Sequence, residues 1–330
     1  MRLDRLDPVS DRAQCCSVLA AGRRCSMLAK HHRKGGSVGV KPDEEIARQF
    51  EALIDDPKKT ENHAQKFLEE HTEFLIPSWF QNHPMAMNSV ISKFPIGPRT
   101  ADFAYLMSDS ATWILVLVEI ESPHKKIFSG SSKHVKPTSA FEEALSQTHV
   151  WKEFFEEHPA EVRESVRPIL VPSGRERNPL KLRRVLIIGR SADHDGNESR
   201  RKRMSTIEED HKVKILTYDS LLGHYRRGQG EKRCVLSPRG TGFAIKRMDV
   251  FPTRTFAFVR PENLHVPPRF IAKLEAAGYQ MKEWLANKPL MFGDKWATKP
   301  EGWDDGGMID RVYGVAIDAV QKGRLKRAAK

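Results

Sequence analysis

One stretch, Thr100–Pro123, constrains the fold of this 330-residue chain more than any other part of it. Its sequence is TADFAYLMSDSATWILVLVEIESP. Ser108–Ser110 has the composition of a tight turn. Trp113–Ile120 is a nearly continuous apolar run rich in β-branched and aromatic residues, which is typical of a strand buried on both faces. The stretch therefore predicts two paired strands, with the second one inside a sheet.

Three acidic residues lie at the end of this hairpin that is away from the turn. Asp102 begins the first strand, and Glu119 and Glu121 end the second. Because side chains alternate along a strand, Glu119 and Glu121 point to the same side, within reach of Asp102. Crowded carboxylates repel each other unless a cation lies between them, and a divalent metal with oxygen ligands is the usual solution. The alternative interpretation is that these acids are only solvated loop entries.

The charge of the chain favours a polyanionic partner. Its 55 Lys and Arg residues against 43 Asp and Glu give a formal net charge of +12 and a pI of about 9.5. Such an excess indicates nucleic acid before membrane, although it also serves solubility. No apolar run is long enough to span a bilayer, and the first residues, MRLDRLDPVS, lack the apolar core of a signal peptide. We therefore expect a cytoplasmic protein with reduced cysteines.

Residues 1–40 form a separate basic segment that contains cysteine and histidine. Thiolate and imidazole groups are zinc ligands, and a structural zinc site needs four of them. The candidates here are Cys16, Cys25, His31 and His32. Their spacing matches no standard zinc site, so a flexible basic arm with incidental cysteines is the alternative.

Two helices are expected before the hairpin. Pro42–Asp56 has apolar residues at helical spacing and a proline suited to its first turn. Thr60 is a good N-cap for a second helix from Glu61 to about Phe74. Taken alone, Glu61 is a first-turn acid favoured by the helix dipole.

A lysine-rich loop and a long helix are expected after the hairpin. The loop, His124–Pro137, contains Lys125 and Lys126, which either are solvated or contact phosphate. Thr138 or Ser139 can cap a helix reaching about Glu157, in which Gln147 and Trp151 lie one turn apart on one face.

The rest of the chain alternates strands and helices at first and then changes character. Strands are expected at Asn88–Phe94, Arg167–Val171, Arg184–Ile188 and Val213–Thr217, a helix or loop at Arg200–Glu209 and a short helix at Asp219–Tyr225. This pattern predicts an α/β domain with a mixed sheet over residues 41–230. Residues 231–330, with paired strands expected in Phe243–Val259 and a helix in Pro268–Ala286, are interpreted as an α+β accessory region.

The order of these elements resembles that of the PD-(D/E)XK nuclease superfamily. Four local sequences, EIESPHKKIF, AFEEALSQTHVW, RVLIIGRS and KILTYDSLL, resemble the Shedu-type anti-phage nuclease domain, also called the DUF4263 domain. The resemblance covers about Pro42–Arg227, and the spacing of Glu61 from Phe67-Leu68 is similar to the first motif of the family. The segments before and after it are not covered.

The resemblance implies metal-dependent cleavage of phosphodiester bonds. Asp102 and Glu119 would be ligands of Mg²⁺ or Mn²⁺, joined by the backbone carbonyl of Ile120. Glu61 would support this metal or a second one, and Gln147 would orient the water or a phosphate. The resemblance also implies assembly into homo-oligomers.

The chain departs from the superfamily pattern at Glu121, where a lysine is expected. Three interpretations stay open. Glu121 binds a second metal, which would activate water and stabilise the leaving oxygen; a lysine from the following loop, Lys125 or Lys126, takes the missing role; or catalysis is lost and DNA binding remains.

Three functions follow from these observations. The first is a metal-dependent DNA endonuclease of anti-phage defence that holds DNA through its phosphates. The second is a non-catalytic nucleic-acid-binding sensor with the same fold, and the third is a structural or assembly protein whose acids are incidental. A terminal segment is expected to regulate or assemble the nuclease domain.

Overall fold

The structure is a computed structural model, and it describes residues 42–75, 89–108, 111–131, 134–170, 177–249 and 259–287. The proposed zinc ligands Cys16, Cys25, His31 and His32 lie outside these residues, as does the tip of the hairpin turn. Among the described residues, no helix is both long and apolar enough to cross a membrane.

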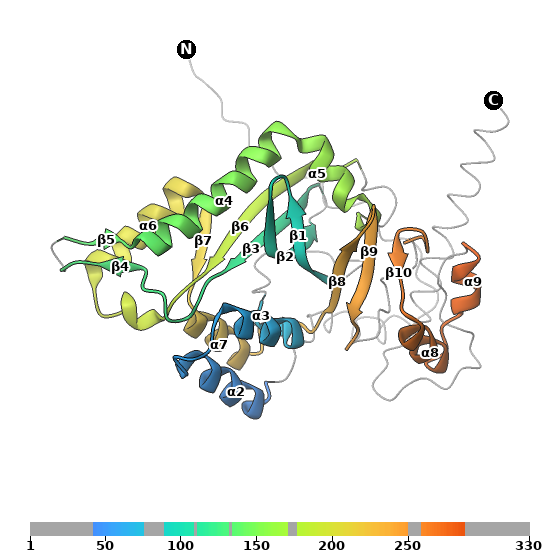
Figure 1. The fold of residues 1–330 in the computed structure, drawn as a ribbon, viewed down its shortest axis with the longest axis horizontal. Helices are drawn as coiled ribbons and strands as arrows, with labels where there is room; N and C mark the ends of the chain where they lie inside the picture. Colours follow the sequence, from blue (N-terminus) through green and yellow to red (C-terminus); the bar gives the residue numbers. More distant parts are fainter. Residues whose placement is uncertain are drawn as a thin grey trace, which may run out of the picture. The chain divides into compact units, whose positions relative to one another are not determined.

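A mixed sheet forms the centre of the described part of the chain (Figure 1). Its eight strands follow the order β10-β9-β8-β1-β2-β3-β6-β7. The bounds are β1 Ser89–Ile96, β2 Arg99–Ser108, β3 Trp113–Ile120, β6 Leu180–Ile187, β7 Val213–Leu216, β8 Cys234–Arg239, β9 Gly242–Arg247 and β10 Leu264–His265. A small separate hairpin consists of β4 Phe128–Ser129 and β5 Lys136–Pro137.

The predicted hairpin is confirmed and lies in the middle of this sheet. β2 pairs antiparallel with β3 from Phe103 opposite Val118 to Ser108 opposite Trp113. β1 pairs antiparallel with β2 on the other side, whereas β3, β6 and β7 run parallel to one another. The prediction of a mixed α/β sheet is therefore confirmed.

Helices cover both faces of the sheet (Figure 1). One face carries α2 Glu44–Asp55, α3 Glu61–Glu70, the 3-10 turn η1 Thr72–Phe74 and α7 Tyr218–Arg226. The other carries α4 Ser139–Glu157, α5 Pro159–Val166 and α6 Glu198–His211. Short 3-10 turns occur at η2 Arg167–Ile169 and η3 Ser191–Asp193, and α8 Pro268–Ala276 and α9 Met281–Leu285 follow β10.

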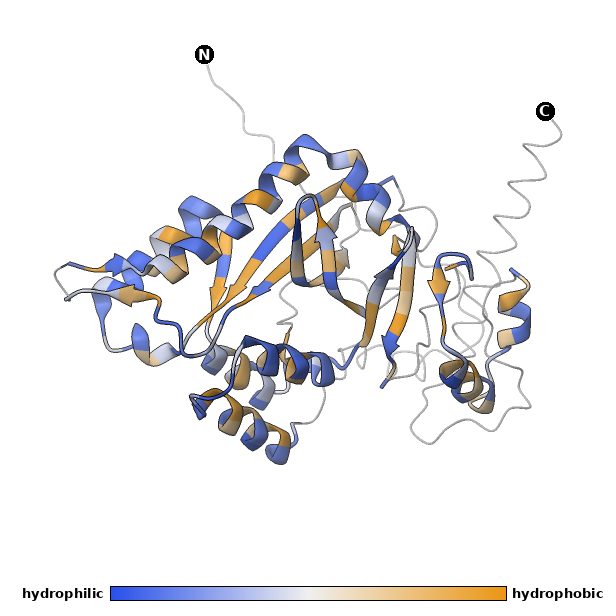
Figure 2. Cartoon of the chain, in the orientation of Figure 1, coloured by the Kyte–Doolittle hydropathy of each residue, from blue (hydrophilic) through white to orange (hydrophobic). Residues whose placement is uncertain are grey.

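The strand β3 is buried on both faces, as its apolar run predicted. Trp113 and Leu117 belong to the core on the α4 side, whereas Val116 and Ile120 belong to the core on the α2 and α3 side. In Figure 2, hydrophobic stretches lie on the central strands, and the helices alternate hydrophobic and hydrophilic residues along their length. Burial on both faces fixes the register of this strand, since a slip by one residue would exchange its two faces.

The helix starts agree with the predicted caps. The hydroxyl of Thr138 accepts a hydrogen bond from Phe141 N at 3.3 Å at the start of α4. Thr60 precedes α3 as predicted, although this helix ends at Glu70 and is followed by η1. The helix predicted at Pro42–Asp56 begins at Glu44, so Pro42 precedes its first turn; Asp43 is the N-cap, and its side chain accepts from Glu45 N at 2.9 Å.

The strand predicted at Arg167–Val171 was wrong for the described residues Arg167–Leu170, and Val171 lies outside them. The chain forms α5 and then the 3-10 turn η2 there, and Ile169 and Leu170 enter the core from this turn. Pro159 starts α5 with a fixed backbone angle, and Pro168 has no N–H to donate to a strand ladder. An apolar run of this length does not by itself distinguish a strand from a buried turn.

After residue 230, the described strands β8, β9 and β10 continue the same sheet. β8 pairs parallel with β1, from Ser89 opposite Cys234 to Ile91 opposite Leu236, and β9 pairs antiparallel with β8. The first strand of this pair therefore precedes the predicted range of paired strands. The predicted helix Pro268–Ala286 is divided into α8 and α9 at Gly278, whose φ is +94°. A separate role for residues 231–330 stays a prediction.

Candidate functional site

The strands β2 and β3 separate at the end of the hairpin, and Asp102 lies where they part. The last paired residues are Phe103 and Val118. Beyond them, Oδ2 of Asp102 accepts a hydrogen bond from Ile120 N at 2.8 Å, in the place of a backbone ladder bond. β3 stays paired with β6 as far as Ile120 opposite Ile187. One edge of β3 is therefore fixed, and the other faces a buried carboxylate.

The backbone of Ile120 faces this opening. In a strand, the N–H and C=O groups of one residue point to the same side. Because the N–H of Ile120 points to Asp102, its carbonyl, a predicted metal ligand, is directed to the same opening.

Glu119 is the most strongly perturbed acid of the site. The register of the hairpin places it across from Asp102, and it is only 7% exposed. Its Oε1 accepts a hydrogen bond from Nε2 of Gln147 on α4, whereas its buried Oε2 has no hydrogen-bond partner. Burial, followed by the charges of Asp102, Glu121 and Glu61, raises the pKa of Glu119 to about 9. The carboxyl group is therefore protonated at neutral pH unless a cation joins it.

Glu61 and Glu121 complete a group of four acids. Glu61 is the first residue of α3, and burial, Asp102 and Glu121 raise its pKa. Glu121 follows β3 directly, with its N–H bonded to the carbonyl of Ile187 at 2.8 Å. The hydroxyl of Tyr218 on α7 donates to the carbonyl of Glu121 at 2.6 Å. The acids thus come from a helix and two strands whose positions are fixed by packing and by backbone hydrogen bonds.

Two lysines neutralise part of this acidic group. Nζ of Lys93 on β1 lies 2.5 Å from Oδ1 of Asp102. Nζ of Lys125 donates to Oε2 of Glu121, so this loop lysine lies at the site. Lys126 is exposed, and its backbone carbonyl accepts a hydrogen bond from the hydroxyl of Thr138.

The loop that carries Lys125 is held in place by buried polar contacts. Oδ2 of Asp193 accepts hydrogen bonds from Ile127 N and Phe128 N, each at 2.8 Å. Arg200 in turn pairs with Oδ1 of Asp193 at 2.9 Å. The loop is therefore tied to η3 and α6, and Lys125 is presented to Glu121 from a fixed backbone.

Lys93 is a residue of the site that was not predicted from the sequence. No motif marks it, and it becomes visible only through the pairing of β1 with β2. The tight turn between these strands, with Ile96 opposite Arg99, sets a register in which residue 93 lies across from residue 102. The sequence Pro95-Ile96-Gly97-Pro98 has the composition of a turn, so counting back from it is the signal that would have found this lysine.

The donor atoms of the site suit a hard divalent cation. All four acidic side chains offer carboxylate oxygens, which are the ligands that Mg²⁺ and Mn²⁺ prefer. The unpartnered Oε2 of Glu119 is a buried oxygen in need of a positive partner. Within the described ranges, no three His, Cys, Asp or Glu side chains are arranged as a metal-binding group. Lys93, Lys125 and Gln147 instead contact the carboxylate oxygens.

The chain was compared with known families and proteins. Residues 58–222 match the family model described as Shedu protein SduA, C-terminal. The matched residues include Glu61, Asp102, Glu119, Glu121 and Gln147. No curated protein matches the chain.

Proposed function

The chain belongs to the Shedu SduA C-terminal family, whose role is anti-phage defence, and from this we propose that it is a divalent-metal-dependent DNA nuclease. One observation carries the proposal. Four carboxylates, with one buried oxygen left unpartnered, gather where β2 and β3 separate. A structural role would favour a partner for this oxygen, since a buried polar atom without a hydrogen bond is costly.

The arrangement of elements supports a PD-(D/E)XK-like core. β1, β2 and β3 form an antiparallel meander, α4 crosses one face, and β6 returns parallel to β3. Asp102 lies on β2 and Glu119 near the end of β3, and in the proposed core they would be the two acids of the motif. Glu121 takes the position of the motif lysine.

The proposed roles of the residues follow from their contacts. Asp102, Glu119 and the carbonyl of Ile120 would hold Mg²⁺ or Mn²⁺, with Glu61 and Glu121 beside them. When bound, the cation would supply an attacking hydroxide at neutral pH and stabilise the charge on the leaving oxygen. Gln147 holds Glu119 by one oxygen and leaves the other directed at the site.

The proposed substrate is DNA bound through its phosphates. The net charge of +12 supplies attraction that does not depend on sequence. DNA and further copies of the chain are the partners that we propose, on the basis of charge and of the family, respectively.

A second candidate function is nucleic-acid sensing without cleavage. Lys93 and Lys125 already neutralise Asp102 and Glu121, an arrangement that also suits a site without a cation. Under this alternative, the residues would bind DNA, but no metal would be needed.

Digestion of supercoiled and linear DNA distinguishes the two functions. The full-length protein, Asp102→Ala and Glu119→Ala are each incubated with Mg²⁺, Mn²⁺ or EDTA. We expect cleavage by the wild type that requires the metal and falls by on the order of 10³-fold in both variants, which retain DNA binding. Cleavage in EDTA, or DNA binding by a wild type that cleaves neither substrate, would contradict the nuclease proposal.

A further inference from the structure

We propose that Lys93 on β1 replaces the lysine that the nuclease motif has at the position of Glu121. Its ammonium group would move from Asp102 to a phosphate oxygen of the substrate and supply the positive charge there. This inference rests on the proposed nuclease function and adds a catalytic residue to it. The sequence motif points only to the end of β3 or to the loop after it. The structure points to the strand on the opposite side of Asp102.

The position of Lys93 follows from strand pairing. Ser92 lies opposite Phe103 and Phe94 lies opposite Ala101, so residue 93 is across from Asp102. The lysine Nζ contacts Oδ1 of the same carboxylate whose Oδ2 accepts from Ile120 N. Its ammonium group therefore reaches the place where β2 and β3 separate, and it does so from a strand rather than from a loop.

The backbone at Lys93 supports a functional role. Its φ is +55°, in the left-handed region that residues other than glycine rarely adopt, and this conformation costs on the order of 1 kcal/mol or more. The residue lies inside β1, away from the turn at Gly97, so the turn does not require this conformation. A glycine or asparagine would adopt it more easily, but neither carries a positive charge.

The pleat of both strands is interrupted at this pair. Ile91 and Phe94 contact the same core, although regular alternation would place them on opposite faces. Ala101 and Ala104 on β2 also share one core. Both strands therefore change their side-chain alternation beside Lys93 and Asp102, which directs these two side chains toward each other.

The side chain of Lys93 is suited to meet a substrate. It is 51% exposed, while that of Asp102 is 7% exposed, so the lysine lies between the buried acid and solvent. A phosphodiester approaching Asp102 from solvent would therefore meet this ammonium group. A point charge on a flexible stem is also able to exchange one anionic partner for another.

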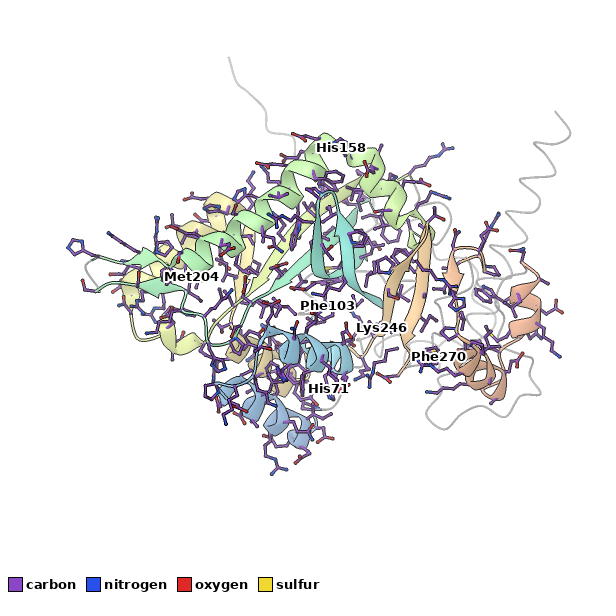
Figure 3. All side chains as sticks on the ribbon, in the orientation of Figure 1. His71, Phe103, His158, Met204, Lys246 and Phe270 are labelled. Carbon is purple, nitrogen blue, oxygen red and sulfur yellow. The ribbon has the colours of Figure 1, made fainter. Side chains whose placement is uncertain are left out.

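The other lysines near the site are less suited to this role. Lys125 is bound to Glu121 and lies on the loop that Asp193 fixes. Lys246 on β9 pairs with Glu69 on α3 at 2.7 Å. Lys246 lies on the side of the sheet that α3 covers, as does Phe103, the neighbour of Asp102; both are labelled in Figure 3. Lys246 is a matched control, because it is a half-exposed, ion-paired lysine beside β1.

This role predicts opposite effects on metal binding and on cleavage. Lys93 and a divalent cation both seek the carboxylate of Asp102, so removing the lysine charge favours the cation. The same change removes a positive charge that would stabilise the negative charge developing on the phosphate. A lysine that only supported the fold would not separate the two readouts in this way.

The test compares wild type, Lys93→Gln, Lys93→Arg and Lys246→Gln in the full-length protein. Mn²⁺ affinity is measured by titration calorimetry without DNA, and the cleavage rate is measured at saturating Mn²⁺. We expect Lys93→Gln to bind Mn²⁺ several-fold more tightly and to cleave about 10²-fold more slowly. Lys93→Arg keeps the charge and should recover part of the rate, and Lys246→Gln should match the wild type in both readouts.

The possible failures are distinct. A Lys93→Gln protein that cleaves at the wild-type rate overturns the role of Lys93 and leaves the nuclease function standing. Slower cleavage together with weaker Mn²⁺ binding indicates damage to the site and also overturns it; thermal melts of each variant establish folding. A wild type that binds Mn²⁺ but never cleaves DNA overturns the nuclease function, and the role of Lys93 with it.

Discussion

Two charged clusters of this molecule satisfy their carboxylates in different ways. At the acidic site, four acids share two lysines, and one buried oxygen of Glu119 has no partner. At the second cluster, Asp219 on α7 accepts from Nε and Nη2 of Arg190 at 3.0 and 2.9 Å and from Ser191 N at 2.6 Å. Arg190 also contacts the carbonyl of Ile54 and the carboxylate of Asp55.

The pKa shifts run in opposite directions in the two clusters. Burial alone would raise the pKa of Asp219, but its hydrogen bonds with Arg190 and Ser191 N hold it below the ordinary value. Burial and neighbouring acids raise the pKa of Glu119 to about 9. The Asp219 cluster is thus satisfied by the chain itself and stabilises the fold, whereas the acidic site leaves a buried carboxylate oxygen of Glu119 without a partner, to which the proposed cation would bind.

The largest effect on stability is expected from Arg190→Ala. This change removes the bidentate contact to Asp219 and the link to the end of α2, so it should lower the free energy of unfolding by about 2–3 kcal/mol. Denaturant unfolding without divalent cations measures this effect. Arg226→Ala is the control, because its pairs with Glu44 and Glu51 are exposed and contribute little. Equal losses in the two variants would remove the distinction between a structural cluster and surface pairing.

An effect of opposite sign, a gain in stability that depends on pH, is expected from Glu119→Gln. Since the pKa of Glu119 is raised in the folded state, the folded protein binds more protons than the unfolded chain between about pH 4.5 and pH 9. Wild-type stability should therefore fall as the pH rises through this interval, by at most about 1.4 kcal/mol per pH unit from this group. Glu119→Gln should lack this fall and be more stable than wild type at pH 8 in EDTA.

The Asp219 cluster supplies the control for this measurement. The pKa of Asp219 is lowered in the folded state, so its ionised carboxylate stabilises the fold at a pH above the ordinary pKa of an aspartate. This contribution is lost as the pH falls through the lowered pKa. The free energy of unfolding is measured by denaturant from pH 3 to pH 9. The difference between Glu119→Gln and wild type should grow toward high pH, and the difference between Arg190→Ala and wild type should be smallest at low pH. A constant difference between Glu119→Gln and wild type at every pH would contradict the interpretation of Glu119.

The two clusters also differ in how far the sequence predicts them. Asp102 and Glu119 are found by strand alternation and by the ends of an apolar run, which are local signals. Lys93 depends on the register between two strands and on a backbone conformation that no propensity assigns to lysine. The contacts of Arg190 join residues far apart along the chain, so a single sequence gives no sign of them.

The same limit explains the errors and successes in the fold. The apolar run of β3 is long and flanked by polar residues, and its strand was predicted correctly. The predicted strand at Arg167–Val171 has similar composition, but it follows a helix that starts at Pro159, and residues Arg167–Ile169 form a 3-10 turn. Local composition therefore decides where a segment is buried, and its neighbours decide its conformation.

The smallest effect is expected from Lys125→Gln. If Lys93 supplies the required positive charge, Lys125 only neutralises Glu121, and its loss should lower the cleavage rate by no more than a few-fold. The loop should keep its position, since Asp193 and Thr138 hold its backbone. Cleavage assays of Lys125→Gln beside Lys93→Gln at equal Mn²⁺ saturation measure the difference. A larger loss in Lys125→Gln would instead assign the missing motif lysine to the loop. The acidic site would then depend on the loop that directly follows β3 rather than on the pairing of β1 with β2.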